Sequence, residues 1–154
     1  MMSNKTLRIV AIVLLILTLA FIWGHSMRSH DDSKAESRAL LEWLAGWLAK
    51  LGIHVDTSDD HPIRKLAHFV EFGVLGVSLA LVMLTGRGCS RQRSLNCVFV
   101  GMAVALIDET IQIFSGLGSL VSDTWLDLSG ALAGLLLVIG IMWLRERRKR
   151  RSSE

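Results

Sequence analysis

Eight polar side chains interrupt long apolar stretches of this sequence, and their types could carry out chemistry. Five are candidates for transferring protons or contacting a substrate: His68, Glu71, Asp108, Glu109 and Gln112. Three are candidates for binding a ligand: Lys65, Asp123 and Asp127. A histidine among carboxylates can act as a general acid or base, and a lysine can hold a phosphate. Such an oxygen-rich set also suits a divalent cation such as Mg²⁺ or Ca²⁺.

These eight residues, which we call the polar cluster, share one helical face within each apolar stretch. Lys65 and Glu71 lie three residues on either side of His68, which gives an arc of about 120° at 100° per residue. The next two groups also fall on one face each: Asp108, Glu109 and Gln112, then Asp123 and Asp127. Two glycines, Gly130 and Gly134, continue the last face. Because glycine lets membrane helices approach closely, that face is expected to pack against another helix.

The apolar stretches are long enough to cross a membrane. The chain has 154 residues, of which 51% are hydrophobic and 20% charged, and its apolar residues come in blocks near the ~20 residues that a spanning helix needs. This composition excludes a disordered, collagen-like, coiled-coil or disulfide-scaffold chain. We therefore expect an all-α integral membrane protein, a single membrane domain over residues 1–154, with spans at 7–23, 62–84, 94–114 and 122–144.

The positions of Lys and Arg predict how these spans are oriented. With four spans, the N-terminal segment, the loop after the second span and the C-terminal tail share one side, which holds eleven Lys and Arg against six on the other. Basic residues gather in cytoplasmic segments, so both termini are expected in the cytoplasm. The polar cluster then lies within ~10 Å of the outer interface, at 1.5 Å per residue. Trp23, Trp125 and Trp143 stand at span ends, where interfacial aromatic belts form.

Two segments outside the spans are expected to meet the membrane surface. Residues 34–52 predict an amphipathic helix, whose apolar face holds Leu40, Leu41, Trp43, Leu44, Trp47, Leu48 and Leu51. This helix is expected either to lie flat on the outer leaflet or to pack over the bundle. The basic cytoplasmic tail, 145–154, is expected to rest against anionic lipid, and we predict no nucleic-acid binding.

The position of the polar cluster inside the spans favours a function over a structural role. A charge at mid-membrane costs roughly 2.5–3.5 kcal/mol, whereas a polar contact between spans contributes only ~0.6 kcal/mol on average. Hydrogen bonding between helices would therefore repay this cost poorly. We expect some of the carboxylates to be protonated, or a cation to be bound among them.

Three motifs within residues 62–135 resemble those of the VanZ family. Residues 64–72, Arg-Lys-Leu-Ala-His-Phe-Val-Glu-Phe, are similar to its R-K-x-x-H-F-x-E-Y motif. Residues 108–112 are similar to its D-E-x-x-Q motif, and residues 123–130 resemble its D-x-x-x-N/D-x-x-G motif. The resemblance implies a multi-pass plasma-membrane protein, in a family associated with resistance to the glycopeptide antibiotic teicoplanin. It implies no particular reaction.

The sequence departs from the family pattern at two places. Phe72 stands where a tyrosine is common, so any role of that hydroxyl is absent here. The segment 114–122 lacks the arginine that family members often carry there. If that arginine grips an anionic ligand in relatives, Lys65 must do so in this chain, or the ligand differs.

The residues leave three functions open. In the first, the chain is an enzyme that acts on a lipid-linked envelope precursor. Glu71 and Glu109 would then be the acid and base, His68 a shuttle or base, and the remaining polar groups would orient them or hold a cation. In the second, it binds a membrane lipid, such a precursor or a glycopeptide without turnover. In the third, it is a proton-coupled transporter, against which the apolar inner halves of the spans argue.

Overall fold

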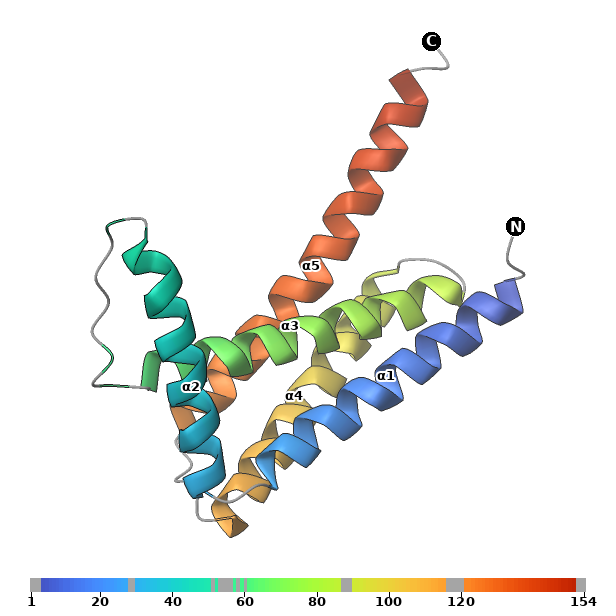
Figure 1. The fold of residues 1–154 in the computed structure, drawn as a ribbon. Coiled ribbons are helices and arrows are strands. Elements are labelled where there is room, and N and C mark those ends of the chain that lie inside the picture. Colours follow the sequence, from blue (N-terminus) through green and yellow to red (C-terminus); the bar gives the residue numbers. More distant parts are fainter. Residues whose placement is uncertain are drawn as a thin grey trace.

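The chain forms five helices and no strand within the residues that the structure describes. This computed structural model describes residues 4–27, 30–50, 61–86, 90–115 and 121–151, together with Gly52, Thr57 and Asp59. The helices are α1 (Asn4–Ser26), α2 (His30–Ala49), α3 (His61–Thr85), α4 (Arg91–Phe114) and α5 (Val121–Arg151), shown in Figure 1. The prediction of an all-α protein is confirmed.

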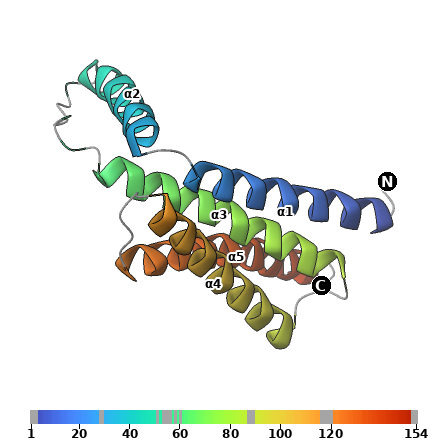
Figure 2. The ribbon, with the colours of Figure 1, turned by 90° about the horizontal axis from the view of Figure 1, so that it is seen from below.

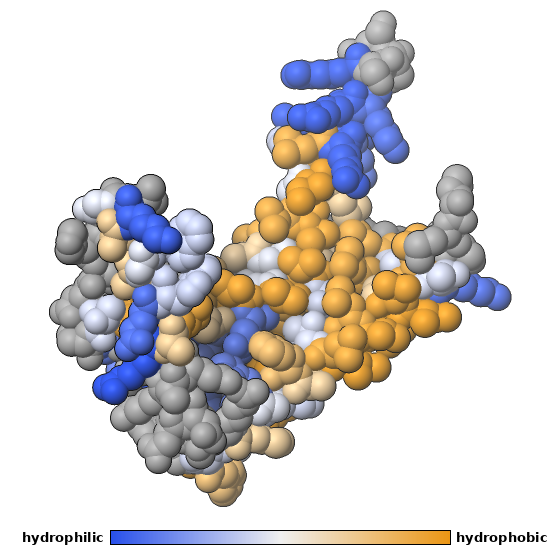
Figure 3. Space-filling view, viewed as in Figure 1, coloured by the Kyte–Doolittle hydropathy of each residue, from blue (hydrophilic) through white to orange (hydrophobic). Residues whose placement is uncertain are grey.

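Four of these helices are long and apolar enough to cross a membrane, namely α1, α3, α4 and α5. Their outward side chains are largely apolar, and Figure 3 shows this apolar surface over the bundle, with a hydrophilic end at the C-terminus of α5. The four predicted spans are therefore confirmed as helices of spanning length. Their orientation in the membrane stays a prediction.

Local hydrogen bonds explain where two of the spans begin. The Asp59 carboxylate accepts a hydrogen bond from the backbone N–H of His61, at 3.0 Å, and Pro62 follows in the first turn, where a missing donor costs nothing. Ser90 caps α4, because its hydroxyl accepts from the backbone N–H of Arg93.

The last helix is longer than the predicted span. It continues from Val121 through the basic tail to Arg151. In this extension the guanidinium of Arg147 stacks on the ring of Trp143, with its Cζ 3.7 Å from the ring centroid. The basic residues thus belong to one continuous helix, which rises away from α1 and α3 in Figure 1.

The closest packing in the fold joins α3 to α5 and uses glycine on both helices. A Cβ placed on Gly130 would overlap the backbone of Phe69, and one placed on Gly134 would overlap the backbone of Gly73 and Val77. On α3, a Cβ on Gly76 would overlap the backbone of Ala131. The predicted glycine stripe is therefore confirmed as a helix contact, and it fixes α5 beside α3.

We expect Gly134→Leu to abolish the folded protein. No flexible side chain can move aside for the new one, because its neighbours are backbone atoms, so the cost should exceed the usual 1–3 kcal/mol of overpacking, by about a factor of two. The matched control is Gly140→Leu on the same helix, where a Cβ meets nothing within 4 Å. Fluorescence-detected size-exclusion chromatography of detergent extracts measures the outcome. A monodisperse Gly134→Leu peak equal to that of the control would contradict this packing.

The apolar core lies where α1, α3, α4 and α5 meet. Its buried members are Ile22, Phe72, Leu75, Leu79, Val104, Ala105 and Ala131. Figures 1 and 2 both show α1 lying alongside α3, and α4 passes behind these two helices in Figure 1. Trp23 packs against this core and its indole nitrogen is buried, whereas Trp125 and Trp143 are exposed. Trp23 therefore differs from the expected belt position, because α1 is already covered by its neighbours at this point.

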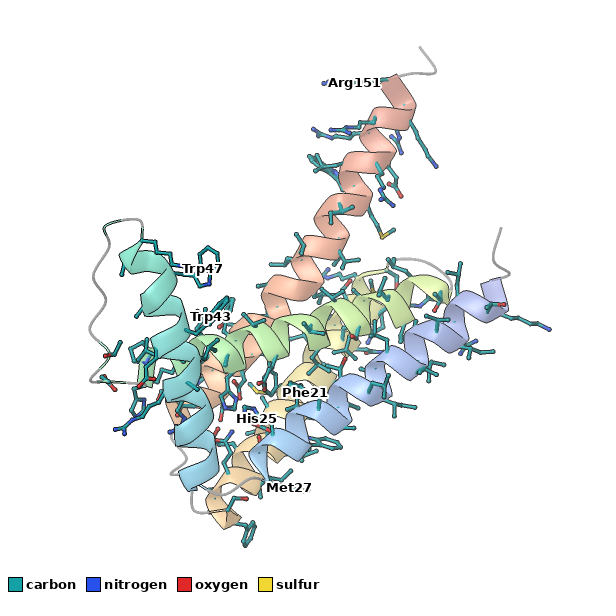
Figure 4. The ribbon with its side chains drawn as sticks, viewed as in Figure 1. Phe21, His25, Met27, Trp43, Trp47 and Arg151 are labelled. Atoms are coloured by element: carbon teal, nitrogen blue, oxygen red, sulfur yellow. The ribbon has the colours of Figure 1, made fainter. Side chains whose placement is uncertain are left out.

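Helix α2 lies across the end of the bundle and contacts it at α3. Leu41 is buried, but Trp43 and Trp47 are more than half exposed, and both project from the same side of α2 in Figure 4. The helix predicted for residues 34–52 is thus present over His30–Ala49. Its placement on a lipid surface stays a prediction.

Candidate functional site

The polar cluster lies at one end of the bundle, where four helices meet. It is built from the N-terminal parts of α3 and α5 and the C-terminal part of α4, which run antiparallel and so bring these segments to the same level. The C-terminal end of α1 joins them there. The shared level of the three polar groups was expected from the sequence, whereas the contribution of α1 was not.

Asp108 stands at the centre of the site and is fully buried. The Ser26 hydroxyl of α1 donates to its Oδ1 at 2.6 Å, and Gln112 Nε2 donates to its Oδ2 at 2.8 Å. Gln112 is one helical turn further along α4, so the pair is formed within one helix, while Ser26 links that helix to α1. Two donors therefore hold the Asp108 carboxylate in one orientation.

His68 lies between two buried carboxylates from other helices. Its Nδ1 is 3.7 Å from Asp127 Oδ1 and 4.0 Å from Asp108 Oδ2. These distances are longer than a hydrogen bond, so the imidazole faces both acids without being bonded to either. The arrangement brings α3, α4 and α5 together around one small space.

Glu71 is paired with a histidine that the sequence analysis did not select. His25 Nδ1 of α1 lies 3.0 Å from Glu71 Oε1, and the His25 ring stacks on that of His68 with centroids 6.2 Å apart. Figure 4 shows His25 at the C-terminal end of α1. His25 and Ser26 follow the predicted first span, 7–23, by two and three residues. The helical rise of 1.5 Å per residue placed the other polar groups near one interface, and applying it to the end of this span would have identified both residues.

Lys65 and Asp123 form the most exposed part of the site. Lys65 Nζ lies 3.4 Å from Asp123 Oδ1, and the lysine side chain is 45% exposed. An exposed pair of this kind contributes little to stability. Lys65 is therefore available at the rim to meet an anionic group.

Glu109 and Asp127 are the least satisfied groups of the site. Glu109 is 6% exposed and Asp127 1%, yet none of their four carboxylate oxygens has a hydrogen-bond partner in the described part of the chain. The charges of Glu71, Asp108, Glu109 and Asp123 all act on Asp127. The polar cluster is thus brought together as predicted, but Glu109 does not share the hydrogen bonds of Asp108 and Gln112.

The two departures from the family motifs have different outcomes. Phe72 is fully buried in the apolar core, so this position serves packing rather than the site. The loop that lacks the family's arginine lies mostly outside the described residues, which end at Ser115 and resume at Val121.

An apolar groove of about 700 Å³ opens beside the site between α1, α2 and α3. Phe21 and Leu17 of α1, Leu40 of α2 and Val70 of α3 line it. Glu71 also lines this groove, and it is the residue that pairs with His25. The groove and the polar cluster are therefore continuous through one carboxylate.

These features define a multi-pass helical membrane protein with a buried polar cluster at one end of its spans. The chain belongs to the VanZ/LLP1 family, which it matches over residues 8–144. The match extends beyond the three motifs in 62–135 and includes α1 and α2, which supply Ser26, His25 and one wall of the groove. No curated protein and no solved structure matches the chain.

Proposed function

We propose that this VanZ/LLP1 protein resides in the bacterial plasma membrane with both termini in the cytoplasm, and binds a lipid-linked envelope molecule at the outer leaflet. One observation carries the proposal: Glu71 belongs both to the apolar groove and to the buried polar cluster. A site of this kind matches an amphiphile, with a hydrocarbon chain in the groove and a polar head among the ionised groups.

The dimensions and chemistry of the two parts support such a ligand. Pockets for small ligands enclose roughly 300–1,000 Å³ and are mostly apolar with a few convergent polar groups, as here. The groove lies along spanning helices, where its natural contents are hydrocarbon. Lys65 at the rim suits a phosphate or carboxylate on the head group.

The polar cluster also has the groups for chemistry on that head. His68 is held beside Asp108 and Asp127 without a hydrogen bond to either, and the Glu109 carboxylate has no hydrogen-bond partner among the described residues. An imidazole and a free carboxylate in an apolar setting can serve as acid and base. An enzyme of this kind would change the envelope lipid chemically, whereas a binding protein would leave it intact. The VanZ resemblance makes glycopeptide sensitivity the phenotype to measure.

Blocking the groove should release the lipid. Ala67 lines the groove, so Ala67→Trp is expected to lower the lipid that copurifies with the protein about tenfold, the equivalent of ~1.4 kcal/mol of binding free energy. The measurement is mass spectrometry of lipid extracts from protein taken directly from its membrane with a solubilising copolymer, compared with the bulk membrane.

The control is Ala103→Trp, an equal substitution on an exposed position of α4 outside the groove. It should retain the same lipid enrichment as the unmodified protein. Equal enrichment in both variants would overturn the groove as the lipid site, and no enrichment of any lipid in the unmodified protein would overturn the proposed function.

A further inference from the structure

We propose that His68, Asp108 and Asp127 form a binding site for one divalent transition-metal cation, of the Mn²⁺ or Zn²⁺ type. Each residue offers one ligand atom, and these three atoms lie within 4.8 Å of one another. They come from three different helices, α3, α4 and α5, so a bound cation would tie the spans together. The inference goes beyond the proposed function, because it requires no lipid.

The distances between the three ligand atoms are close to those found around a bound cation. Ligands on a cation with bonds of 2.0–2.2 Å lie about 3 to 4 Å apart. The observed separations from His68 Nδ1 are 3.7 Å to Asp127 and 4.0 Å to Asp108. Small side-chain shifts would complete the coordination, because the three ligand atoms already lie within 4.8 Å of one another, and water could fill the remaining positions.

A second observation indicates that a ligand is needed here. Asp127 is 1% exposed and both of its carboxylate oxygens lack a hydrogen-bond partner among the described residues. A buried, ionised carboxylate without a partner is very costly in an apolar layer. A cation beside His68 would supply the missing partner directly.

The ionisable side chains at this level carry more negative than positive charge, which also favours a bound cation. Glu71, Asp108 and Asp127 lie beside two imidazoles, those of His25 and His68, and a fourth carboxylate, that of Glu109, acts on Asp127 through its charge. With His25 protonated and His68 neutral, as a metal ligand must be, ionisation of these four carboxylates leaves three negative charges. Lys65 pairs with Asp123 at the rim instead. One divalent cation would lower this excess to a single negative charge.

The ligand set also favours particular metals. Carboxylates alone suit Mg²⁺ or Ca²⁺, as expected from the sequence, but an imidazole ligand shifts the preference towards Mn²⁺ or Zn²⁺. Ser26 and Gln112 already orient the Asp108 carboxylate through hydrogen bonds at 2.6 and 2.8 Å. Such supporting contacts are a regular feature of metal sites.

Metal binding by the purified full chain tests the proposal. The protein, with any histidine tag removed, is stripped with a chelator and equilibrated with Mn²⁺ or Zn²⁺. Bound metal is then measured by inductively coupled plasma mass spectrometry. We expect about one equivalent per chain and a rise in melting temperature on metal addition. Asp127→Asn should lose both effects while keeping its elution volume, because it preserves shape and removes a buried charge.

Two further variants keep the test decisive. Glu146→Gln removes an exposed carboxylate near the C-terminal end of the same helix, outside the polar cluster, and should bind metal like the unmodified chain. His68→Gln removes a ligand from another helix and should lose binding. The proposal is overturned if the unmodified chain binds no metal, or if both ligand variants bind as it does. Lipid copurification of the stripped protein reports separately on the proposed function.

Discussion

Glu109→Gln is expected to abolish whatever envelope phenotype expression of this protein confers, with glycopeptide sensitivity as the readout, while leaving its membrane abundance unchanged. Glu109 is 6% exposed, and neither of its oxygens has a hydrogen-bond partner among the described residues. Within the described residues, this carboxylate therefore makes no hydrogen bond between helices. Removing its charge should leave the fold as stable or more stable, because a buried unpaired charge is lost.

A control variant and a second site variant accompany this prediction. Glu146→Gln changes an exposed glutamate on the basic end of α5 and should have no effect. His68→Ala should match Glu109→Gln, because His68 is the only imidazole that faces both Asp108 and Asp127 within the described chain. Full phenotype in both site variants at normal abundance would exclude a functional role. Loss of phenotype together with loss of protein would assign the cluster to folding.

The second prediction with a large effect concerns orientation. In a chain without its two native cysteines, Thr57→Cys should be labelled completely by an impermeant thiol reagent on intact cells. Thr57 is exposed and precedes α3 at the end of the bundle that holds the polar cluster. Restoring Cys89, which lies outside the described residues in the loop between α3 and α4, should give no labelling until the cells are permeabilised. Cys89 is expected to be shielded because Lys and Arg are in excess on its side of the membrane, which is typical of the cytoplasmic side.

Residues at both ends of the bundle make this test unambiguous. Arg91→Cys, at the start of α4, should behave like Cys89 and remain shielded in intact cells. Labelling of Cys89 or Arg91→Cys from outside, with Thr57→Cys protected, would place the site at the cytoplasmic face. The proposed outer-leaflet ligand would then be wrong.

The sequence predicted the meeting of α3, α4 and α5 at the polar cluster because helix rise is fixed. Once four spans are placed in an antiparallel order, the level of His68, Asp108 and Asp127 follows from 1.5 Å per residue. The contact of Gly130 and Gly134 followed in the same way, from residue size and helical face. These inferences needed no knowledge of the tertiary packing.

Other features required the packed structure. Ser26 and His25 lie just past the apolar stretch of α1, so hydropathy alone ended the span before them. The groove depends on how α2 and α1 lie against α3, which no local pattern specifies. Likewise, Asp108 is fully hydrogen-bonded and Glu109 is not, although the two are adjacent in sequence. The Ser26 donor comes from the neighbouring helix α1, whereas Gln112 lies one turn along α4 itself.

An experimental structure of the protein in discs cut from its native membrane would test most directly whether the polar cluster is a ligand site. We expect a density feature among His68, Asp108 and Asp127, and an elongated density that runs from Glu71 into the groove beside Val70. A site in which Glu71 and Glu109 face lipid on opposite sides of the bundle, with the groove filled by the protein's own side chains, would contradict the proposal.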